Sequence, residues 1–544
     1  MPRRESDQDE EFDVVVIGSG GAGLTAAILA HDHGAQVAVL ERSDKIGGTT
    51  AVSGGGVWIP RSDHMAEVGM TDSRDEALAY CKALVAGQAG DDLVEAFVDT
   101  AHKMVRYLEA HTPLKFTPWT IPDYHPNVVG AKPRGRSIEP AIFDKRALGS
   151  WETALRQSPF YFLPLTLQEV LFTYQGHVRP QNLPPDVILE RMERGLTTCG
   201  NALVAALLKA CLDRAVAFRL DTRARELVLE DGCVTGVRAE AASGDLFVRA
   251  RKGVVLASGG FEWNDALKAR YLPGPVSHPS SPPQNEGDGL LMAIEAGAAL
   301  GNMSEVWGSP AAPIPGELYD GRDLSRLVVP ERACPHAILV NQRGERFVNE
   351  GTTYNELGKV FHERDTNTGA YCNLPCWAIL DGQYRSRYPI LTVLPGDPDP
   401  EWLPKADTLE ELALKVGIDP QGLAATGARW NGFVREGQDA DFGRHRSPMD
   451  PSAAHPSMGT IETPPFYALP VYQGTLGTKG GPLTNVQGQV VNVRGDVLPG
   501  LFAAGNVMAG VSGPSYFGGG ATIGLAMTWG YVCGINAARP TDVS

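Results

Sequence analysis

Three glycines and a carboxylate near the start of the chain have the types and spacing that bind a dinucleotide. Gly18 permits a sharp turn, Gly20 lets a pyrophosphate approach the backbone, and Gly23 lets a helix pack close to a strand. A helix that begins in such a turn points its N-terminal N–H groups at the phosphates. Glu41 stands where an acid accepts hydrogen bonds from a ribose 2′-OH, and its charge disfavours a 2′-phosphate. These residues predict the binding of an adenine dinucleotide other than NADP.

The elements that must hold these residues are a strand, a helix and a second strand. Residues 14–17 are an apolar run typical of a buried parallel strand, residues 24–33 continue at helical spacing, and residues 37–40 form the second strand. Residues 14–30 carry no charge, but their four glycines, their short length and the acidic residues 9–11 argue against a membrane span. The window predicts a βαβ unit.

Composition narrows the class of protein. The chain has 544 residues, 43% hydrophobic and 21% charged, as expected for a soluble protein of two or three domains. Its net charge of −16 makes nucleic acid and anionic membranes poor partners, because both select clustered Lys and Arg. After Arg3 and Arg4 the N-terminus turns acidic, with no apolar segment before the first strand. We therefore expect no secretion signal and a cytoplasmic location.

The cysteines and the acidic residues do not form a metal pattern. The chain has eight scattered cysteines, and the closest pair, Cys372 and Cys376, lacks the two-residue spacing of zinc and redox pairs. We expect reduced structural thiols and no metal site.

Two later segments look like further pieces of the nucleotide-binding domain. Residues 216–241 and 246–257 alternate around turns at Asp231 and Ser243, which predicts an antiparallel element that leads into a strand over residues 253–260. Residues 490–506 predict a hairpin and a strand that ends at Gly505 and Asn506, and a helix follows from about Ala521. Residues 307–474 are rich in Pro, Trp and Tyr, with a helical stretch at residues 409–416, and we interpret them as an inserted substrate domain.

Motifs spread over nearly the whole chain resemble those of the FAD-dependent oxidoreductases of the fumarate reductase and 3-ketosteroid dehydrogenase superfamily. They are residues 18–23 with Glu41, and residues 47–56, 257–261, 286–289, 344–350 and 503–506. The resemblance implies an α/β fold, with a Rossmann-type FAD-binding domain over residues 1–306 and 475–544 and an inserted α+β catalytic domain over residues 307–474. It also implies an extended FAD, with Glu41 on the adenosine ribose, residues 47–56 near the pyrophosphate and flavin, and Asn506 near the flavin. The implied cofactor-binding residues are Gly18, Gly20, Gly21, Ala22, Gly23, Glu41, Arg42, Gly48, Thr49, Thr50, Ser53, Gly54, Gly55, Gly259, Gly505, Asn506, Ala521 and Ile523.

Within this superfamily, residues 513–531 resemble the tail of the 3-ketosteroid Δ1-dehydrogenases. Tyr516 and Gly520 fall in the family's register, but Phe517 stands where the family has proline. This departure leaves open whether Phe517 narrows the pocket or repositions Tyr516. The family's second tyrosine follows the residue 347–350 motif by four positions and is Tyr354, and the best match to its third is Tyr124, after Asp123.

The resemblance implies a role for each of these residues in dehydrogenation across C1–C2 of a 3-ketosteroid. The hydroxyl of Tyr516 and the N–H of Gly520 would hydrogen-bond the C3 oxygen as an oxyanion hole does. Tyr354 would take the C2 proton, supported by Tyr124, and flavin N5 would take the C1 hydride. The implied partners are a small apolar, steroid-like ketone and an external electron acceptor that the sequence does not name.

Other functions stay open at this point. A 3-ketosteroid Δ4-(5α)-dehydrogenase or another ketone desaturase would use the same flavin with shifted base geometry. A fumarate-reductase-like ene reductase would need cationic clamps for two carboxylates, for which Arg332, His336 and Arg346 are available. A non-catalytic flavin carrier and an NAD-dependent dehydrogenase are further alternatives. Six aromatic residues could line a steroid pocket or belong to the core, and we leave them unassigned: Trp119, Phe143, Trp151, Phe160, Phe162 and Trp307.

Overall fold

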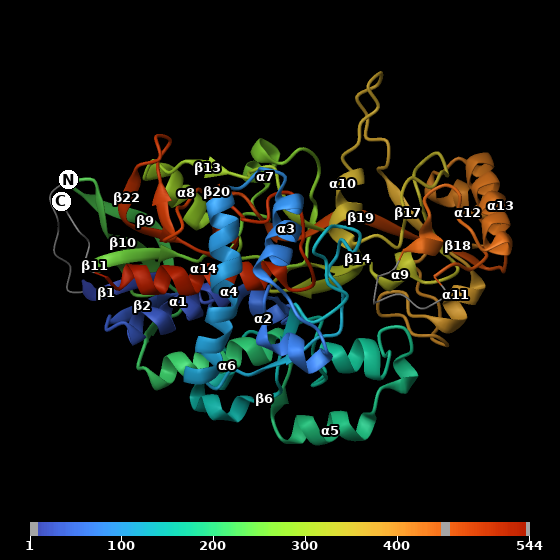
Figure 1. Cartoon of the computed structure of the whole chain (residues 1–544). Coiled ribbons are helices and arrows are strands. Elements are labelled where there is room, and N and C mark those ends of the chain that lie inside the picture. The colour runs from blue at the N-terminus through green and yellow to red at the C-terminus, as the bar shows by residue number, and fades with distance from the viewer. Residues whose placement is uncertain (1–8, 448–456, 540–544) are drawn as a thin grey trace.

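The computed structural model describes residues 9–447 and 457–539. Two large β-sheets organise these residues (Figure 1). The eight-stranded first sheet lies on the left of Figure 1 and the seven-stranded second sheet on the right. The mixed α/β fold class predicted from the sequence is confirmed. Arg3 and Arg4 lie outside the described residues.

The first sheet has a buried parallel centre. Val14, Val15 and Val16 of β1 are fully buried, and Val15 pairs with Ala38 on one side and Val254 on the other. A strand buried on both faces needs an unbroken apolar run, which is what the sequence has. The strands, in spatial order, are β21 (Gln489–Val491), β22 (Val497–Ala503), β11 (Gly244–Leu256), β1 (Glu10–Ile17), β2 (Val37–Leu40) and β8 (Ala217–Arg219), and β9 (Arg223–Glu230) and β10 (Cys233–Ala241) extend β11.

The predicted antiparallel element is present in this sheet. β9 and β10 are joined by Asp231 and Gly232, which both have positive φ (51° and 80°), as a tight hairpin turn requires. One predicted boundary is wrong: β11 ends at Leu256 rather than at residue 260. The chain turns there because Gly259 has φ +79°, outside the strand region.

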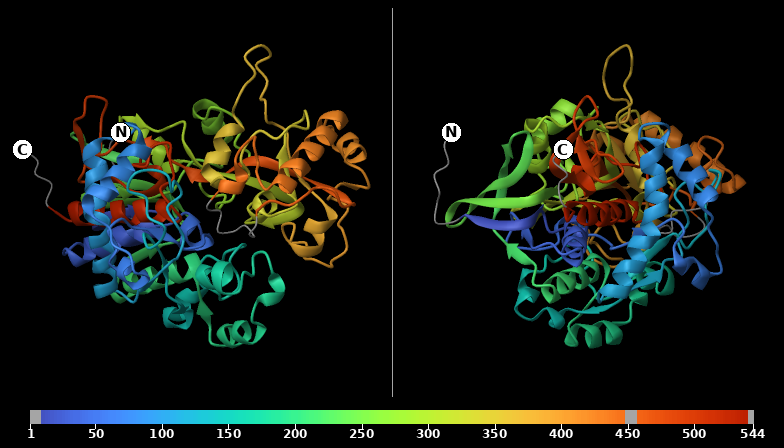
Figure 2. Two further views of the ribbon diagram at one scale, coloured as in Figure 1. Left: turned by 45° about the vertical axis from the view of Figure 1, so that its right-hand side comes forward. Right: turned by 60° about the vertical axis from the view of Figure 1, so that its left-hand side comes forward.

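Three helices cover the centre of the first sheet: α1 (Gly21–Asp32), α6 (Cys199–Asp213) and α14 (Ala521–Ala537). α1 begins three residues before the predicted residue 24, and α14 begins where it was predicted. α14 lies along α1 in Figures 1 and 2. This close approach requires glycine, because a Cβ at Gly530 or Gly534 would come within 2.4 Å of an α1 backbone oxygen. The first and last segments of the chain therefore pack as one unit.

The second sheet is mostly antiparallel and centres on β19 (Phe466–Thr478). Its strands are β15 (Arg322–Leu327), β14 (Val306–Tyr319), β19, β17 (Cys376–Leu380) and β16 (Ala337–Val340), with β12 (His278–Pro279) and β18 (Lys405–Ala406) also paired to β19. Its helices are α9 (Pro330–Ala333), α10 (Tyr354–Val360), α11 (Gly382–Arg387), α12 (Leu409–Val416) and α13 (Pro420–Glu436). The predicted helix at residues 409–416 is confirmed. The domain boundaries at residues 307 and 474 stay a prediction.

The remaining elements lie outside the two large sheets, and their short strands form three small sheets of two or three strands. The short strands are β3 (Val57–Trp58), β4 (Phe116–Pro118), β5 (Ser137–Pro140), β6 (Phe143–Asp144), β7 (Leu196–Thr197), β13 (Leu300–Gly301) and β20 (Gly481–Pro482). The remaining helices are α2 (Gly48–Val52), α3 (Arg74–Val85), α4 (Asp91–His111), α5 (Pro185–Glu193), α7 (Asp265–Tyr271) and α8 (Asp288–Glu295). Short 3-10 or π turns are η1 (Asp63–Val68), η2 (Lys145–Ala154), η3 (Glu169–Thr173), η4 (Pro180–Asn182), η5 (Arg444–Arg446) and η6 (Gly505–Val507).

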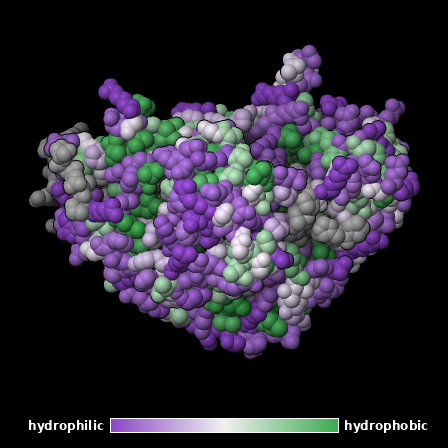
Figure 3. Space-filling view, in the orientation of Figure 1, coloured by the Kyte–Doolittle hydropathy of each residue, from purple (hydrophilic) through white to green (hydrophobic). Residues whose placement is uncertain are grey.

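The polarity of the surface and the state of the cysteines match what the composition predicts. The face in Figure 3 is mainly hydrophilic, with apolar patches between the polar areas. Within residues 9–447 and 457–539, no helix is long and apolar enough to cross a membrane. All eight cysteines are free thiols, as predicted.

Candidate active site

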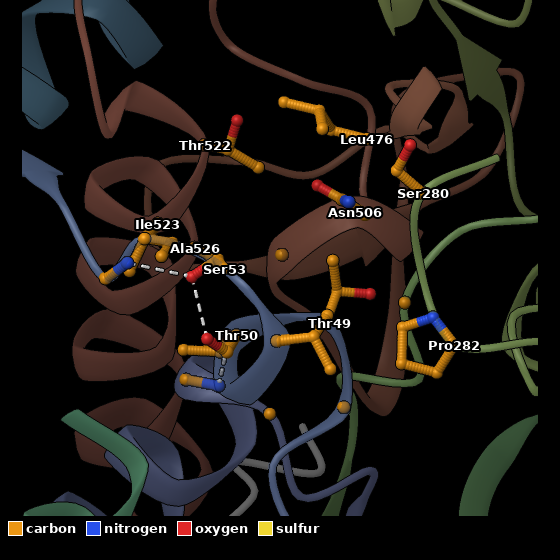
Figure 4. A pocket seen from close by; sticks show the side chains of 18 of the residues that line it. Thr49, Thr50, Ser53, Ser280, Pro282, Leu476, Asn506, Thr522, Ile523 and Ala526 are labelled. Atoms are coloured by element: carbon orange, nitrogen blue, oxygen red, sulfur yellow. Dashed lines mark hydrogen bonds between the residues drawn. The ribbon is translucent and has the colours of Figure 1, made fainter. Parts of the chain in front are cut away.

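One cavity of about 440 Å³ brings nearly all predicted site residues together. It lies at the carboxyl ends of β1, β2 and β11 and continues toward the end of β15 at Leu327 and the start of α10 at Tyr354. Figure 4 shows side chains from three distant parts of the chain around it, among them Thr49, Pro282 and Asn506. Of the predicted residues, only Gly23 and Ala521 do not line it.

The glycine turn forms the floor of this cavity. A Cβ at Gly18 would lie 2.4 Å from the oxygen of Ala257, and one at Gly23 would lie 2.0 Å from the oxygen of Gly18. A Cβ at Gly20 would meet only Thr50 Oγ1 and Gly47 O, at 3.7 and 3.9 Å. Gly23 is thus a packing glycine, as predicted, and Gly18 makes the predicted turn with φ +104° and has no room for a side chain either. The open side of Gly20 leaves room for a ligand beside the N-terminus of α1.

Glu41 and Arg42 directly follow β2 and lie in different environments. The carboxylate of Glu41 lines the cavity and accepts hydrogen bonds from Ser19 N (3.1 Å), Ser19 Oγ (2.6 Å) and Ser43 N (3.0 Å). A carboxylate can accept about four hydrogen bonds, so Glu41 can still receive a ribose hydroxyl. The guanidinium of Arg42 is held by Glu286 and Asp288, at 2.9 and 3.1 Å.

The loop of residues 47–56 wraps the cavity through its own hydroxyls. Thr50 Oγ1 accepts from Gly21 N at 3.0 Å, which ties the loop to α1, and Ser53 Oγ donates to Thr50 O at 2.7 Å (Figure 4). Thr49 Oγ1 accepts from the side chain of Asn285 at 2.9 Å. Gly48, Gly54 and the positive-φ glycines Gly55, Gly259 and Gly505 complete this wall, with Ala22 and Ile523 opposite.

The described residues fit a bound FAD. The helix α1 N-terminus faces the cavity, and polar side-chain atoms on the cavity wall have no partner in the described part of the chain: Ser258 Oγ, Gln284 Oε1 and Thr353 Oγ1. Buried polar groups without partners are uncommon unless a ligand or water satisfies them. No group of three or more His, Cys, Asp or Glu side chains that could hold a metal ion occurs among the residues described.

The three predicted tyrosines converge at the other end of the cavity. The hydroxyl of Tyr124 donates to that of Tyr354 at 3.0 Å, and the ring of Tyr516 lies 5.3 and 5.6 Å from theirs, centroid to centroid. Tyr354 is the first residue of α10, Tyr124 lies between β4 and β5, and Tyr516 lies just before α14. Three segments far apart in sequence therefore form one cluster of phenols.

Burial sets the acidity of this cluster. Burial raises the pKa of Tyr354 well above its ordinary value, and the neighbouring phenols of Tyr124 and Tyr516 add to the effect. Burial also raises the pKa of Tyr516, but hydrogen bonds from Thr522, Tyr354 and the backbone of Gly520 oppose it. Tyr516 is therefore the phenol with more donors directed at its oxygen. The Gly520 N–H is directed at the Tyr516 oxygen, so the two groups lie next to each other.

Phe517 does not narrow the cavity. Its side chain is fully buried and points into an aromatic core with Trp58 (5.3 Å), Tyr80 (6.4 Å) and Phe97 (6.3 Å). Its carbonyl accepts from Tyr80 Oη at 2.6 Å and from Tyr124 N at 3.1 Å. The open question about this residue is thus answered: Phe517 anchors the loop beside Tyr516 from the side opposite the cavity.

Replacing Phe517 with alanine should destabilise the protein by about 3–5 kcal/mol, because it removes a buried aromatic ring and leaves a hole in the core. Phe162→Ala is the matched control, since Phe162 is 71% exposed, and it should change the free energy of unfolding by no more than about 0.5 kcal/mol. Urea unfolding followed by tryptophan fluorescence measures both. Equal effects of the two substitutions would show that the Phe517 ring does not anchor the core.

Most of the remaining cavity wall is apolar, although Arg156 and His177 also line it. Trp119 and Phe160, which the sequence left unassigned, line it, whereas Phe143, Trp151, Phe162 and Trp307 do not. The other apolar residues of this part are Ile121, Tyr161, Leu167, Val170, Leu171, Leu327, Val329 and Leu476. Such a surface suits a ligand with a hydrocarbon skeleton.

Several cavity residues were missed from the sequence. Asn285 stands directly before the residue 286–289 motif, so extending that motif by one position would have included it. Thr522 stands inside the tail motif, between the predicted residues Ala521 and Ile523. Ser258 lies within the residue 257–261 motif. Ser280 and Leu476 belong to no motif and reach the cavity only through the pairing of β12 with β19.

The cations considered for a dicarboxylate clamp lie elsewhere. Arg346 pairs with Glu350 and Asp439 at 2.7 and 3.0 Å, Arg332 donates to the backbone oxygens of Glu350 and Thr352, and His336 bonds Thr460 O. None of these three side chains lines the cavity. Their partners lie around the second sheet and outside the cavity, so these cations are not placed to bind the two carboxylates that a fumarate-reductase-like enzyme would hold.

A buried FAD site joined to an apolar slot with polar tyrosines at its end defines a flavin-dependent oxidoreductase. A family model described as an FAD binding domain matches residues 13–523, and the chain belongs to this family. It is an FAD-dependent enzyme, which confirms the predicted cofactor and class.

Individual relatives narrow the comparison. The chain is 36% identical to the 3-oxosteroid 1-dehydrogenase of Mycobacterium tuberculosis, over 97% of this chain and 98% of the relative. It is 37% identical to the 4-oxocyclohexanecarboxylate 2-dehydrogenase of Sinomonas cyclohexanicum, over 96% and 92%. The crystal structure of 3-ketosteroid delta1-dehydrogenase from Sterolibacterium denitrificans, in complex with 1,4-androstadiene-3,17-dione, superposes with a TM-score of 0.89 at 34% identity, covering 97% and 99% of the two chains. The resemblance to 3-ketosteroid Δ1-dehydrogenases is confirmed.

Proposed function

We propose that this enzyme is a 3-ketosteroid Δ1-dehydrogenase. The observation that carries the proposal is the meeting of Tyr124, Tyr354 and Tyr516 at one end of an apolar cavity whose other end fits FAD. The whole-length similarity to 3-oxosteroid 1-dehydrogenases supports the same conclusion.

Tyr516 and Gly520 would bind the substrate's C3 oxygen. The Tyr516 hydroxyl accepts a hydrogen bond from Thr522 Oγ1 at 3.1 Å, so its own hydrogen is available for the ketone. Gly520 has φ +92°, and a Cβ there would lie 2.3 Å from the carbonyl carbon of Gly56, so only glycine can present its N–H at this point. Two donors on one oxygen favour the enolate that forms when a C2 proton leaves.

Tyr354 would take the C2 proton, and Tyr124 shares a hydrogen bond with it at 3.0 Å. The apolar walls around Trp119 and Leu167 exclude water from the steroid skeleton. FAD, when bound, supplies the hydride acceptor for C1. The protein contributes position, a base and an oxygen-binding pair.

Flavin reduction should become faster as pH rises toward alkaline values. The pKa of Tyr354 is raised well above its ordinary value of 10.0 by burial, so the phenolate is scarce at neutral pH and its fraction grows about tenfold per pH unit below the pKa. Anaerobic stopped-flow measurement of flavin reduction at several pH values gives this slope. A rate that does not change with pH would contradict a phenolate base at Tyr354.

The test of the function is anaerobic titration of the purified enzyme with 4-androstene-3,17-dione, with flavin absorbance as the readout and NMR to identify the product. We expect bleaching and a 1,4-diene. A second titration with a 5α-saturated 3-ketosteroid tests the regiochemistry, since a double bond formed at C4–C5 of that substrate would indicate a Δ4-(5α)-dehydrogenase instead. Absence of bleaching with every ketone would overturn the proposal.

A monocyclic ketone acid is the second candidate, because one relative acts on 4-oxocyclohexanecarboxylate. A carboxylate needs a cation, but Arg42 and Arg156 on the cavity wall already pair with Glu286 and Asp320. The apolar wall therefore favours the steroid. Comparison of kcat/KM for the two ketones decides between them.

A further inference from the structure

A second, water-sized cavity lies directly behind the Tyr516 end of the active site. Its volume is about 20 Å³, and a buried water needs about 10–15 Å³ measured in this way. It shares Gly505, Asn506, Thr522 and Ala526 with the main cavity. The two cavities are therefore separated by single side chains.

Lys479 lines this small cavity as a buried cation. Its side chain is 1% exposed, and its Nζ donates to the backbone oxygens of Ser515 (2.8 Å) and Gly513 (3.2 Å). The ammonium also lies 4.1 Å from the centre of the Trp307 ring, a favourable cation–π distance. An ammonium group has three N–H donors, so these two acceptors leave one donor for another partner.

No carboxylate pairs directly with Lys479 in the described part of the chain. Its pKa is lowered to about 7, chiefly by burial; the charge of Glu305 opposes this shift, that of Lys359 adds to it, and that of Glu356 opposes it. A buried ammonium group needs polar neighbours, because burial of a charge without hydrogen-bond partners has a large free-energy cost. Trp529 Nε1, which also lines the cavity, has no hydrogen-bond partner among the residues described.

We propose that a water molecule bound in this cavity joins Lys479 to Thr522, which makes Lys479 a positioning residue at the far end of a hydrogen-bond chain that ends on Tyr516. Lys479 donates to the water, the water donates to Thr522 Oγ1, and Thr522 donates to the Tyr516 hydroxyl at 3.1 Å. Every hydrogen in this chain points toward the ketone oxygen, an arrangement in which each bond strengthens the next. The water would also receive the N–H of Trp529. This inference rests on the proposed role of Tyr516 as the ketone donor.

The same residue holds the loop that carries Tyr516. Buried groups bond the alternate carbonyls of residues 513–519: Lys479 at Gly513 and Ser515, Tyr80 at Phe517, and Ser137 at Gly519. Loss of Lys479 can therefore act through the loop or through the water, and the experiment must separate the two routes.

A double-mutant cycle separates them. At about pH 6, where the Lys479 amine is charged, Lys479→Met and Thr522→Val should each lower kcat/KM for the steroid about tenfold, and the double variant should be no slower than Thr522→Val alone. Multiplying effects in the double variant would show that Lys479 acts through the loop carbonyls only and would overturn the proposal. So would an unchanged rate in Lys479→Met. Lys405→Met, at an exposed site, is the control and should not change the rate.

Two further readouts complete the test. The ratio of wild-type to Lys479→Met activity should fall as pH rises through about 7, since the amine then loses its charge, and a constant ratio would contradict the proposal. A crystal structure of the FAD-loaded enzyme should show a water within hydrogen-bond distance of Lys479 Nζ and Trp529 Nε1, and a cavity without one would overturn it. The crystallographic result does not depend on turnover. It stays informative if the wild type acts on no ketone, a result that would instead overturn the proposed function.

Discussion

Replacing Tyr354 with phenylalanine should lower the rate of flavin reduction by a factor on the order of 10²–10⁴, the usual contribution of a general base. The substitution removes only the hydroxyl that accepts from Tyr124 at 3.0 Å. The residues predicted to hold FAD, among them residues 18, 20–22 and 48–50 of the cavity wall, are not altered, so we expect FAD content to be unchanged. The measurement is anaerobic stopped-flow absorbance with 4-androstene-3,17-dione.

A second readout isolates the proton step from the flavin step. In D₂O the wild type should exchange hydrogen at C2 of a bound ketone, and Tyr354→Phe should not, as followed by NMR. Tyr388→Phe is a suitable control because Tyr388 is buried in the second sheet's core, away from the cavity. C2 exchange at the wild-type rate in Tyr354→Phe would exclude Tyr354 as the base.

Tyr516→Phe should lower kcat/KM by a factor on the order of 10²–10³, the range seen when one oxyanion donor is removed. The hydroxyl of Tyr516 is the side-chain donor of the proposed pair, and Gly520 N–H remains to provide partial stabilisation. The fold should persist, because the Tyr516 ring still packs on Trp307, 4.8 Å away. Steady-state kinetics with the steroid ketone measures the loss.

The comparison with Thr522→Val gives this prediction its control. Thr522 donates to the Tyr516 hydroxyl, and in the proposed chain it acts on the ketone through Tyr516, so its loss should cost about tenfold, less than the loss of Tyr516. If Tyr516→Phe were no slower than Thr522→Val, the ketone oxygen would be bound by other groups.

The cofactor unit could be predicted from the sequence because its parts are local. Residues 14–41 form strand, turn, helix and strand within one window, and the run of Val14 to Ile17 fits a strand buried on both faces. The predicted start of helix α1, residue 24, was three residues too late because the first turn contains Gly21 and Gly23, which are poor helix formers. Packing against α14 stabilises that first turn despite its glycines.

The active-site chemistry could be predicted only through the resemblance. No local pattern distinguishes Tyr124 from the other tyrosines, since its role depends on contacts with residues 230 and more positions away. The direction of Phe517 could not be derived either, because its partners Trp58, Tyr80 and Phe97 come from separate elements.

The sequence by itself therefore determined the class of fold, the FAD-binding turn and the candidate tyrosines, because short-range patterns of glycine, apolar residues and motifs encode them. Only the tertiary structure decided that three phenols meet, that Phe517 faces the core, and that Lys479 lies behind Tyr516. These facts depend on contacts between segments that are remote in the chain. Long-range packing sets the distances between residues that are remote in the chain, and no local pattern records those distances.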